Sequence, residues 1–497
     1  MSMTEQQSSY RQIMKATSIF GGVQVFNVII SIIRSKVIAV LLGPAGMGIA
    51  SLLKSTTDLI GSLSNMGLKA SAVRNIATAY GSGDAEKVGG VVSVFRRLVW
   101  ITGILGTLIT LILAPWLSEI TFGNRDYTLG FMWISVTLLF TQLNDGQLAI
   151  LQGLRRLKSL AKANLAGTAS ALVISIPVYY FFRLKGIVPA IIITAGTTLF
   201  FSWFFARKII INRIVITKKL FKTEGADMLR MGVMLSLSSM IGLGTSYIIR
   251  IFISHKGGVE QVGLYNAGFS FINSYVGMVF TAMGTDYFPR LSGLVHDRKK
   301  LMTTVNNQAE VALLLLAPII TIFLVFINWV VILFYSSEFT EVNNMIHYAA
   351  LGIFFKAISW PISYIFIAKG HTRLFFFSEL IANLYFLLLN IIGYTYGGLD
   401  GLGISFIVNF FLYFVQVFVI AKVKYDFFYN KEFFKIFTIQ FITGILCFIN
   451  VKLLVSPLVY IIGSIMIIFS VIYSLKELNK RMDLKSLLTE RFVKNDR

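Results

Sequence analysis

Apolar residues follow one another in long blocks along nearly the whole chain, and no other feature constrains the fold as strongly. The hydrocarbon core of a bilayer is about 30 Å thick, and a helix needs about 20 apolar residues to cross it. Charged residues make up only 14% of the chain, against about 25% in soluble domains, and the mean hydropathy is +0.75. The sequence therefore predicts an all-α polytopic membrane protein.

Turn residues and charges separate fourteen predicted spans. They cover residues 13–42, 47–67, 90–117, 127–150, 160–182, 186–206, 228–253, 262–287, 303–333, 342–367, 374–396, 400–421, 433–454 and 456–474. If the N-terminus is cytoplasmic, the cytoplasmic segments contain 35 of the 45 Lys and Arg residues and the outer loops contain five. Cytoplasmic loops are enriched in these residues, so we expect both termini in the cytoplasm. The same bias explains the net charge of +22 without a nucleic-acid partner.

The first twelve spans divide into two similar halves of six. Five pairs of Gly or Arg residues recur at a nearly constant offset along the chain. The pairs are Arg34 and Arg250, Gly48 and Gly263, Arg74 and Arg290, Gly153 and Gly370, and Gly186 and Gly401. Six is an even number, so both halves insert in the same orientation and form a parallel repeat.

This repeat predicts two six-helix lobes joined by a basic amphipathic linker on the membrane surface. The expected parts are an N-lobe at 1–206, the linker at 207–225, a C-lobe at 226–421, two extra helices at 422–475 and a cytoplasmic tail at 476–497.

Polar residues recur at helical spacing along the first, second, seventh and eighth spans. The first two spans form a hairpin, Ser31 to Asn65, with a tight turn at Gly43-Pro44-Ala45-Gly46. The uncharged and acidic positions that we expect to line a cavity are Asn27, Ser31, Asp58, Ser62, Ser246, Asn266 and Asn273. Small polar residues also join helices to one another in lipid, and that alternative stays open.

Five cations lie within apolar spans, where a charge costs about 2.5–3.5 kcal/mol. They are Arg34, Lys36, Lys54, Arg250 and Lys356. An Arg guanidinium binds two phosphate oxygens at once, so these residues are candidates for holding an anionic substrate. Lys356 has no counterpart in the other half, and it either contacts the anion or extends toward the interface.

Two carboxylates accompany these cations. Lys54 and Asp58 are spaced i,i+4 and can form an ion pair within one helix. Alternatively, an anionic substrate could displace Asp58 from Lys54, or Asp58 could bind a proton or a sodium ion. Asp145, near the cytoplasmic end of the fourth span, is the second candidate for ion coupling.

The sequence contains no enzyme signature. Neither a G-x-x-x-x-G-K-[ST] phosphate loop nor a G-x-S-x-G element is present, and the four His residues lack metal-ligand spacing. We therefore expect no enzymatic activity, no cofactor and no metal. Protons, sodium ions and the membrane potential all remain candidates for the driving force.

Several motifs resemble a known family. The run LLGPAGMGIAS, its weaker counterpart GGVEQVGLYNAGFS, the GIVPA and GLGIS openings of spans six and twelve, and the twelve-plus-two layout are similar to the polysaccharide-unit flippases. These belong to the multidrug/oligosaccharidyl-lipid/polysaccharide exporter superfamily. The resemblance is closest to the Wzx-type O-antigen translocases and covers nearly the whole chain.

The resemblance implies two lobes around a central V-shaped cavity lined by spans 1, 2, 7 and 8. It implies that an undecaprenyl-diphosphate-linked oligosaccharide moves from the cytoplasmic to the outer leaflet of a bacterial cytoplasmic (inner) membrane by alternating access. Basic cavity residues would hold the diphosphate, and Arg34, Lys36, Lys54 and Arg250 are the matching positions. We expect a monomer that meets its lipid-linked oligosaccharide substrate, membrane lipids and other polysaccharide-assembly proteins, as in lipopolysaccharide biosynthesis.

Two alternatives remain. A drug/cation antiporter of the same superfamily is expected to bind cationic compounds through buried carboxylates. The predicted spans here contain five cations but only two candidate carboxylates, Asp58 and Asp145, which favours an anionic ligand. A membrane glycosyltransferase or polymerase is expected to have a large outer loop with clustered acid and base residues, whereas the outer loops here are short.

Overall fold

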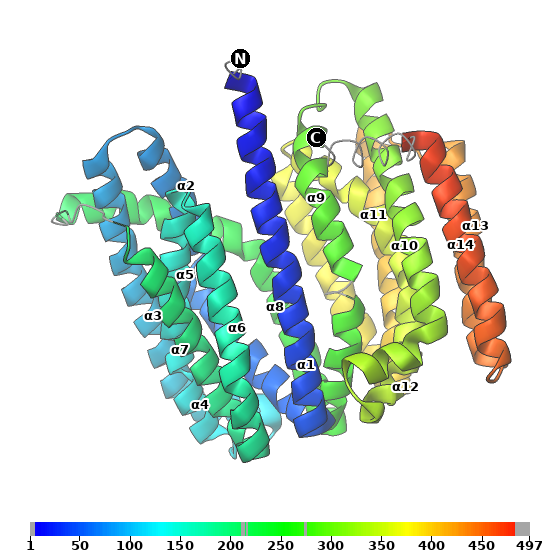
Figure 1. Cartoon of the computed structure of the whole chain (residues 1–497), viewed down its shortest axis with the longest axis horizontal. Helices are drawn as coiled ribbons and strands as arrows, with labels where there is room; N and C mark the ends of the chain where they lie inside the picture. The colour runs from blue at the N-terminus through cyan, green and yellow to red at the C-terminus, as the bar shows by residue number, and fades with distance from the viewer. Residues whose placement is uncertain (1–4, 210–213, 215–216, 273–275, 483–497) are drawn as a thin grey trace, which may run out of the picture. The chain divides into compact units, whose positions relative to one another are not determined.

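The computed structural model describes residues 5–209, 214, 217–272 and 276–482, and it is helical almost throughout (Figure 1). None of these residues forms a β-strand. The α-helices are α1 Glu5–Asn65, α2 Leu68–Gly81, α3 Ala85–Phe122, α4 Thr128–Ile134, α5 Val136–Gly153, α6 Leu157–Phe182, α7 Ile187–Ala206, α8 Lys218–Ser270, α9 Val276–Ser292, α10 Arg298–Phe334, α11 Asn343–Ala368, α12 Thr372–Tyr425, α13 Lys431–Leu453 and α14 Leu458–Met482. Two 3-10 helices, η1 Arg183–Gly186 and η3 Ser337–Val342, connect some of them.

Several of these helices are long enough to cross a bilayer twice. The apolar segment Phe26–Asn65 contains 40 residues. At 1.5 Å per residue a straight helix of that length would measure about 60 Å, about twice the hydrocarbon thickness. The backbone breaks at Gly43 in this segment, at η1 between α6 and α7, and at Gly398 in α12. Within the described residues, eight segments meet the length and hydropathy of membrane spans, and the chain is a multi-pass membrane protein.

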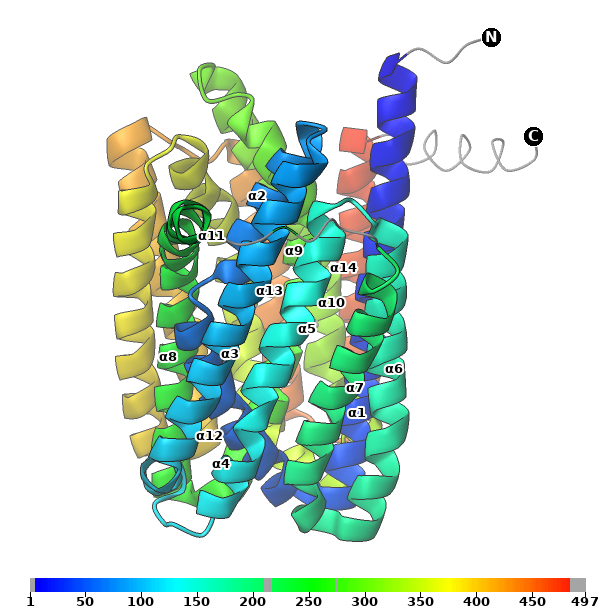
Figure 2. The same cartoon turned by 90° about the vertical axis from the view of Figure 1, so that its left-hand side faces the viewer.

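The contacts divide the chain into two compact units. The first contains Met1–Gly263 and Phe334–Ser336, and the second contains Leu264–Leu333 and Ser337–Arg497. In the first unit α7 packs along α5 and α6, α3 packs along α5, and α1 packs along α6 and α3 (Figure 2). A core of α2, α3 and α5 side chains, including Ile76 and Phe95, is almost fully buried.

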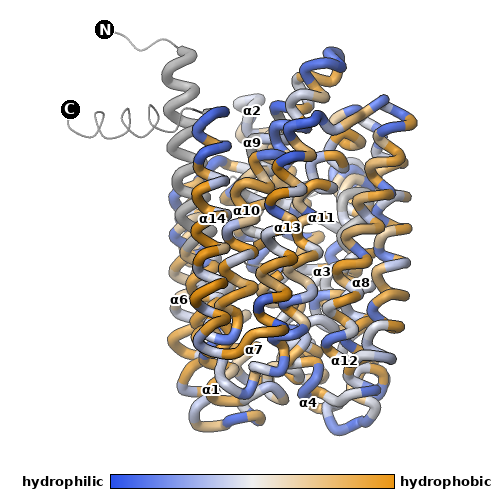
Figure 3. Tube along the Cα trace, turned by 90° about the vertical axis from the view of Figure 1, so that its right-hand side faces the viewer, coloured by the Kyte–Doolittle hydropathy of each residue, from blue (hydrophilic) through white to orange (hydrophobic). Residues whose placement is uncertain are grey.

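In the second unit α11 packs along α12, and α13 packs against both α11 and α14. Aromatic rings join these helices, because Phe354 and Phe355 of α11 lie 5.5 and 5.3 Å from Phe441 of α13. Hydrophobic residues run along most of α13 and α14 (Figure 3). One face of α14 is exposed at Ile461, Ile465, Ile468 and Ile472, which is the spacing of a lipid-facing helix surface.

The backbone conformation repeats itself at one constant offset along the chain. Three pairs of positive-φ residues share this offset: Gly43 and Gly258, Arg155 and Gly370, and Arg183 and Gly398. The members of the first pair have φ/ψ of 66°/−170° and 82°/173°, and those of the last have 51°/−132° and 55°/−135°. These local conformations match the predicted internal repeat and set the hairpin breaks at equivalent places.

Some expected parts coincide only partly with described residues. Residues 210–213 and 215–216 of the predicted linker lie outside the described range. At the start of the linker, the guanidinium of Arg207 lies 4.7 Å from the ring centres of Trp203 and Phe204. The lobe and linker boundaries stay predictions.

Candidate functional site

The hairpin of α1 turns at Gly43, as the sequence predicts. Its φ of 66° is in the left-handed region, which favours glycine because a Cβ would be strained there. Pro44 follows as the first residue of the next helical segment, where its fixed φ fits and its missing N–H is not needed. The same break recurs at Gly258 in α8, so the sequence builds two equivalent hairpins.

Arg34 lies in α1 shortly before the first break and is half-buried. Its Nε has no hydrogen-bond partner among the described residues. Tyr179 of α6 lies close enough to interact with it electrostatically. Lys36, slightly further along α1, is also half-buried. A buried guanidinium nitrogen with unused hydrogen-bonding capacity suits an anionic ligand.

Arg250 lies in α8 eight residues before Gly258, whereas Arg34 lies nine residues before Gly43, and Arg250 is also half-buried. Its guanidinium donates to the backbone carbonyl of Ser246 at 3.1 Å. Thus the candidate Ser246 contributes its main chain to the position of Arg250. Both arginines belong to the first unit.

Lys54 and Asp58 form the predicted ion pair, with Nζ 2.9 Å from the carboxylate oxygen. Their side chains are 69% and 45% exposed, so neither is packed into the helix bundle. An exposed i,i+4 pair contributes only about 0.3–0.5 kcal/mol to stability. A contribution to stability therefore does not explain why a charged pair occurs in an otherwise apolar span.

Of the uncharged candidates that the structure describes, one forms a contact between two helices and the others are exposed or half-buried. Asn27 accepts a hydrogen bond from Thr168 of α6 at 3.3 Å, which is a contact between two helices. Ser31 is exposed, and Ser62 and Asn266 are half-buried. Asn273 lies outside the described residues.

Asp145 is paired rather than isolated. Its carboxylate lies 2.7 Å from Nζ of Lys69, and the two side chains are partly exposed. This ion pair joins α5 to α2.

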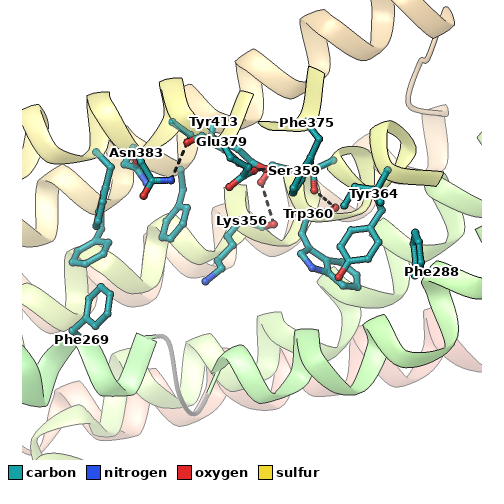
Figure 4. A pocket seen from close by; sticks show the side chains of 17 residues that line it. Phe269, Phe288, Lys356, Ser359, Trp360, Tyr364, Phe375, Glu379, Asn383 and Tyr413 are labelled. Atoms are coloured by element: carbon teal, nitrogen blue, oxygen red, sulfur yellow. Dashed lines mark hydrogen bonds between the residues drawn. The ribbon is translucent and has the colours of Figure 1, made fainter. Parts of the chain in front are cut away.

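Lys356 lines a cavity that lies wholly within the second unit (Figure 4). Its ammonium group lies 5.6 Å from the ring centre of Phe280 and 5.2 Å from that of Phe410. Glu379 of α12 lines the same cavity and accepts a 2.6 Å hydrogen bond from the hydroxyl of Tyr413. Among the described residues, Lys356 is the only sequence-based candidate that lines this cavity.

Glu379 is not among the sequence-based candidates. The signal was available, because it is a single acidic residue inside the predicted apolar span 374–396. The energetic argument that selects Lys356 applies equally to a buried carboxylate. The residues that gather around it, such as Asn383 and Asn409, lie on opposite sides of the break at Gly398 and come together only through the α12 hairpin.

Comparison with known families finds one sequence profile that matches more than half of the chain. The profile of the polysaccharide biosynthesis protein family matches residues 37–344, which include both glycine-broken hairpins. The Lipid III flippase of Escherichia coli (strain K12) is 22% identical over 361 residues, covering 69% of this chain and 82% of that protein. The Lipid III flippase of Shigella flexneri matches with the same identity and coverage.

Solved structures share the fold. An inward-facing multidrug resistance MATE family transporter of the MOP superfamily superposes with a TM-score of 0.70 and 17% identity, covering 81% of this chain and 94% of that one. The Lipid II flippase MurJ in an inward closed conformation has a TM-score of 0.68 and 12% identity, with 94% and 99% coverage. The chain therefore has the same fold as these two solved structures.

Proposed function

Because the chain belongs to the polysaccharide biosynthesis protein family, we propose that it is a flippase for a lipid-linked oligosaccharide. The observation that carries this proposal is the family match across residues 37–344, which contain both hairpin breaks. Arg34 lies just before the matched region and Arg250 lies inside it. The relatives named Lipid III flippase support the same activity class.

The substrate we propose is an undecaprenyl-diphosphate-linked oligosaccharide, such as an O-antigen or a related polysaccharide repeat unit. It moves from the cytoplasmic to the outer leaflet of a bacterial cytoplasmic membrane by alternating access. The lipid chain stays in the bilayer while the polar head passes through the protein. The bias of Lys and Arg toward one set of loops supports cytoplasmic termini.

The diphosphate is the part of this substrate that the cations recognise. Arg34 and Arg250 precede equivalent breaks, and each offers a planar fork that binds two oxygens. Lys36 adds positive charge beside Arg34 in the first arm of the α1 hairpin, and Lys54 adds it in the second arm, beyond Gly43. Asp58 competes with the substrate for Lys54, so substrate binding would open their ion pair.

Energy coupling belongs to the same proposal. Asp58 and Asp145 are the carboxylates that could exchange a proton or a sodium ion, and the membrane potential can act on the charged head directly. Lys69 must release Asp145 before that carboxylate can bind another cation. We propose a monomer as the working unit, with other polysaccharide-assembly proteins as its partners.

A reconstituted flipping assay tests the proposal. Proteoliposomes containing the purified chain receive a fluorescent polyprenyl-diphosphate-linked oligosaccharide, and its appearance in the opposite leaflet is measured. Arg34→Ala and Arg250→Ala should each slow flipping by about tenfold or more, since a charge-assisted contact contributes about 1.5–3 kcal/mol. Arg125→Ala is the matched control, because Arg125 forms an exposed ion pair with Glu119.

The same vesicles distinguish the antiporter alternative. Full flipping by both Arg34→Ala and Arg250→Ala would contradict the role of these cations. The chain is a drug/cation antiporter instead if an ion gradient drives the wild type to export cationic drugs in exchange for the ion, while the lipid-linked oligosaccharide stays in its leaflet. The MATE-family likeness shows only the shared fold and does not favour that outcome.

A further inference from the structure

The cavity around Glu379 is lined mainly by aromatic rings. It has a volume of about 580 Å³, within the range of about 300–1,000 Å³ that is typical of small-molecule sites. Nine of its 17 lining residues are Phe, Tyr or Trp. Phe269 lies at one end, and Trp360, Tyr364 and Phe288 lie toward the other (Figure 4). Rings of this kind offer flat apolar surfaces on which a ligand face can stack.

Polar groups lie in the middle of the cavity, and they include the acceptor oxygens of Glu379 and Asn409. One carboxylate oxygen of Glu379 accepts from Tyr413, which leaves acceptor capacity on the other. Oδ1 of Asn409 has no hydrogen-bond partner among the described residues, although Asn409 is only 8% exposed. Leaving such a buried acceptor unsatisfied costs about 1–3 kcal/mol.

The two serine hydroxyls of the cavity already donate to the main chain. Ser359 donates to the carbonyl of Lys356 at 3.2 Å, and Ser363 donates to the carbonyl of Trp360 at 2.9 Å. The side-chain amide of Asn383 donates to the main-chain carbonyl of Glu379 at 2.9 Å. The cavity therefore offers acceptors and apolar rings, and it suits a ligand that carries several hydroxyl donors.

We propose that this cavity binds a neutral sugar ring of the transported glycan. A pyranose has an apolar face of C–H groups, which stacks on an aromatic ring, and a rim of hydroxyls, which donate to Glu379 and Asn409. The side chains of Lys356 and Glu379 carry opposite formal charges, so the lining favours neither an acidic nor a basic sugar. This inference rests on the proposed function, because it names the part of that substrate which the second unit recognises.

Binding of free sugars to the purified full-length protein tests the inference without transport. The probes are methyl α-glucopyranoside and N-acetylglucosamine, titrated calorimetrically into the protein in detergent, with glycerol as a control polyol that has no ring. At least one sugar should bind saturably, and glycerol should not. A site built around substrate hydroxyls discriminates strongly against ligands that cannot place them.

Two variants remove the polar contacts separately. Asn409→Leu and Glu379→Gln should each weaken sugar binding by about tenfold, as the loss of one buried hydrogen bond predicts. Glu338→Gln, which changes a carboxylate of η3 outside the cavity, should bind as the wild type does. Thermal unfolding shows whether each variant is folded. If one of the two cavity variants misfolds, the comparison with the wild type uses the other.

The outcomes separate this inference from the proposed function. If neither sugar binds the wild type, or if binding is unchanged in both cavity variants, the sugar site is wrong. If sugars bind as expected but the wild type does not flip any lipid-diphosphate oligosaccharide, the flippase proposal is wrong and the cavity is still a sugar site. Flipping without sugar binding contradicts the inference alone.

Discussion

Gly48 and Gly263 occupy equivalent places in the two copies of the repeat, and each packs against the other's hairpin. A Cβ at Gly48 would overlap the carbonyl oxygen of Val259, and a Cβ at Gly263 would overlap that of Pro44. Pro44 and Val259 are separated by the same offset as the two glycines, so one contact is a copy of the other. All these residues belong to the first unit. Small residues at such positions allow two membrane helices to approach closely.

Adding a methyl group to either glycine should therefore push the two hairpins apart. Gly48→Ala and Gly263→Ala should each destabilise the protein by about 1–3 kcal/mol, because the overlapping group is main chain and cannot move aside easily. The thermal unfolding midpoint in detergent measures this effect. Gly61→Ala in the same helix is the control, since no atom lies near its added Cβ. Equal midpoints for all three variants would contradict the close contact.

The repeat also predicts a stabilising substitution. Arg155 and Gly370 both follow a helix at positive φ, and in both copies the next N–H bonds back to the helix, from Arg156 to Leu151 and from His371 to Phe366. Only the second copy has glycine at this left-handed position, where glycine is favoured. Arg155→Gly should raise stability by about 0.5–1 kcal/mol, and Gly370→Ala should lower it by about 1 kcal/mol.

Thermal unfolding of the two variants checks this prediction. The substitutions lie at equivalent places, so each serves as the control for the other. A loss of stability in Arg155→Gly would show that the arginine side chain makes a contact that outweighs its backbone strain.

A buried ionic cluster holds α14 against α10. Arg481 contacts Glu310 at 2.7 Å and Glu477 at 2.6 Å, and the side chain of Glu310 is only 4% exposed. Removing one partner of such a cluster leaves a buried charge without its counterion. Arg481→Ala should therefore cost about 3–5 kcal/mol.

Unfolding of Arg481→Ala, measured beside Arg125→Ala, tests this difference. The exposed pair of Arg125 and Glu119 should contribute no more than about 1 kcal/mol. Similar losses in both variants would mean that the cluster around Glu310 is solvated. A glutamine in place of Glu310 should repeat the larger effect if the charge itself is responsible.

Substitution of Lys54 should change transport while leaving stability nearly unchanged. Its pair with Asp58 is exposed, so Lys54→Gln should change the free energy of unfolding by about 0.5 kcal/mol or less. If Lys54 contacts the diphosphate, the same substitution should slow flipping by about tenfold. Unfolding and flipping are measured on one preparation, and unchanged flipping would remove Lys54 from the proposed site.

Much of the fold follows from local sequence. Apolar blocks define the helices because lipid leaves the backbone no other hydrogen-bond partners. Glycine at 43, 258, 370 and 398 marks backbone turns that few other residues adopt. Arg155 and Arg183 have positive φ without any such signal, so these two turns are recognised only through their counterparts in the second copy.

The candidate sites are less visible in the sequence. Arg34, Lys54 and Asp58 stand out because a charge in an apolar span needs a reason, and the ion pair of the last two follows from their spacing. The cavity around Glu379 depends on tertiary packing, since Trp360 comes from α11, Glu379 from the part of α12 before Gly398 and Asn409 from the part after it. In the sequence alone, each of these residues looks like an ordinary helix-packing residue, because nothing shows that they share one cavity.

The most direct measurement compares two lipids in the same proteoliposomes. One is a polyprenyl-diphosphate-linked oligosaccharide, and the other is a phospholipid of similar charge without a glycan. We predict that the wild-type protein speeds the crossing of the first by at least tenfold over protein-free vesicles and leaves the second unchanged, and that Arg34→Ala removes most of this gain. Equal crossing of the lipid-linked oligosaccharide with and without the protein would contradict the central claim.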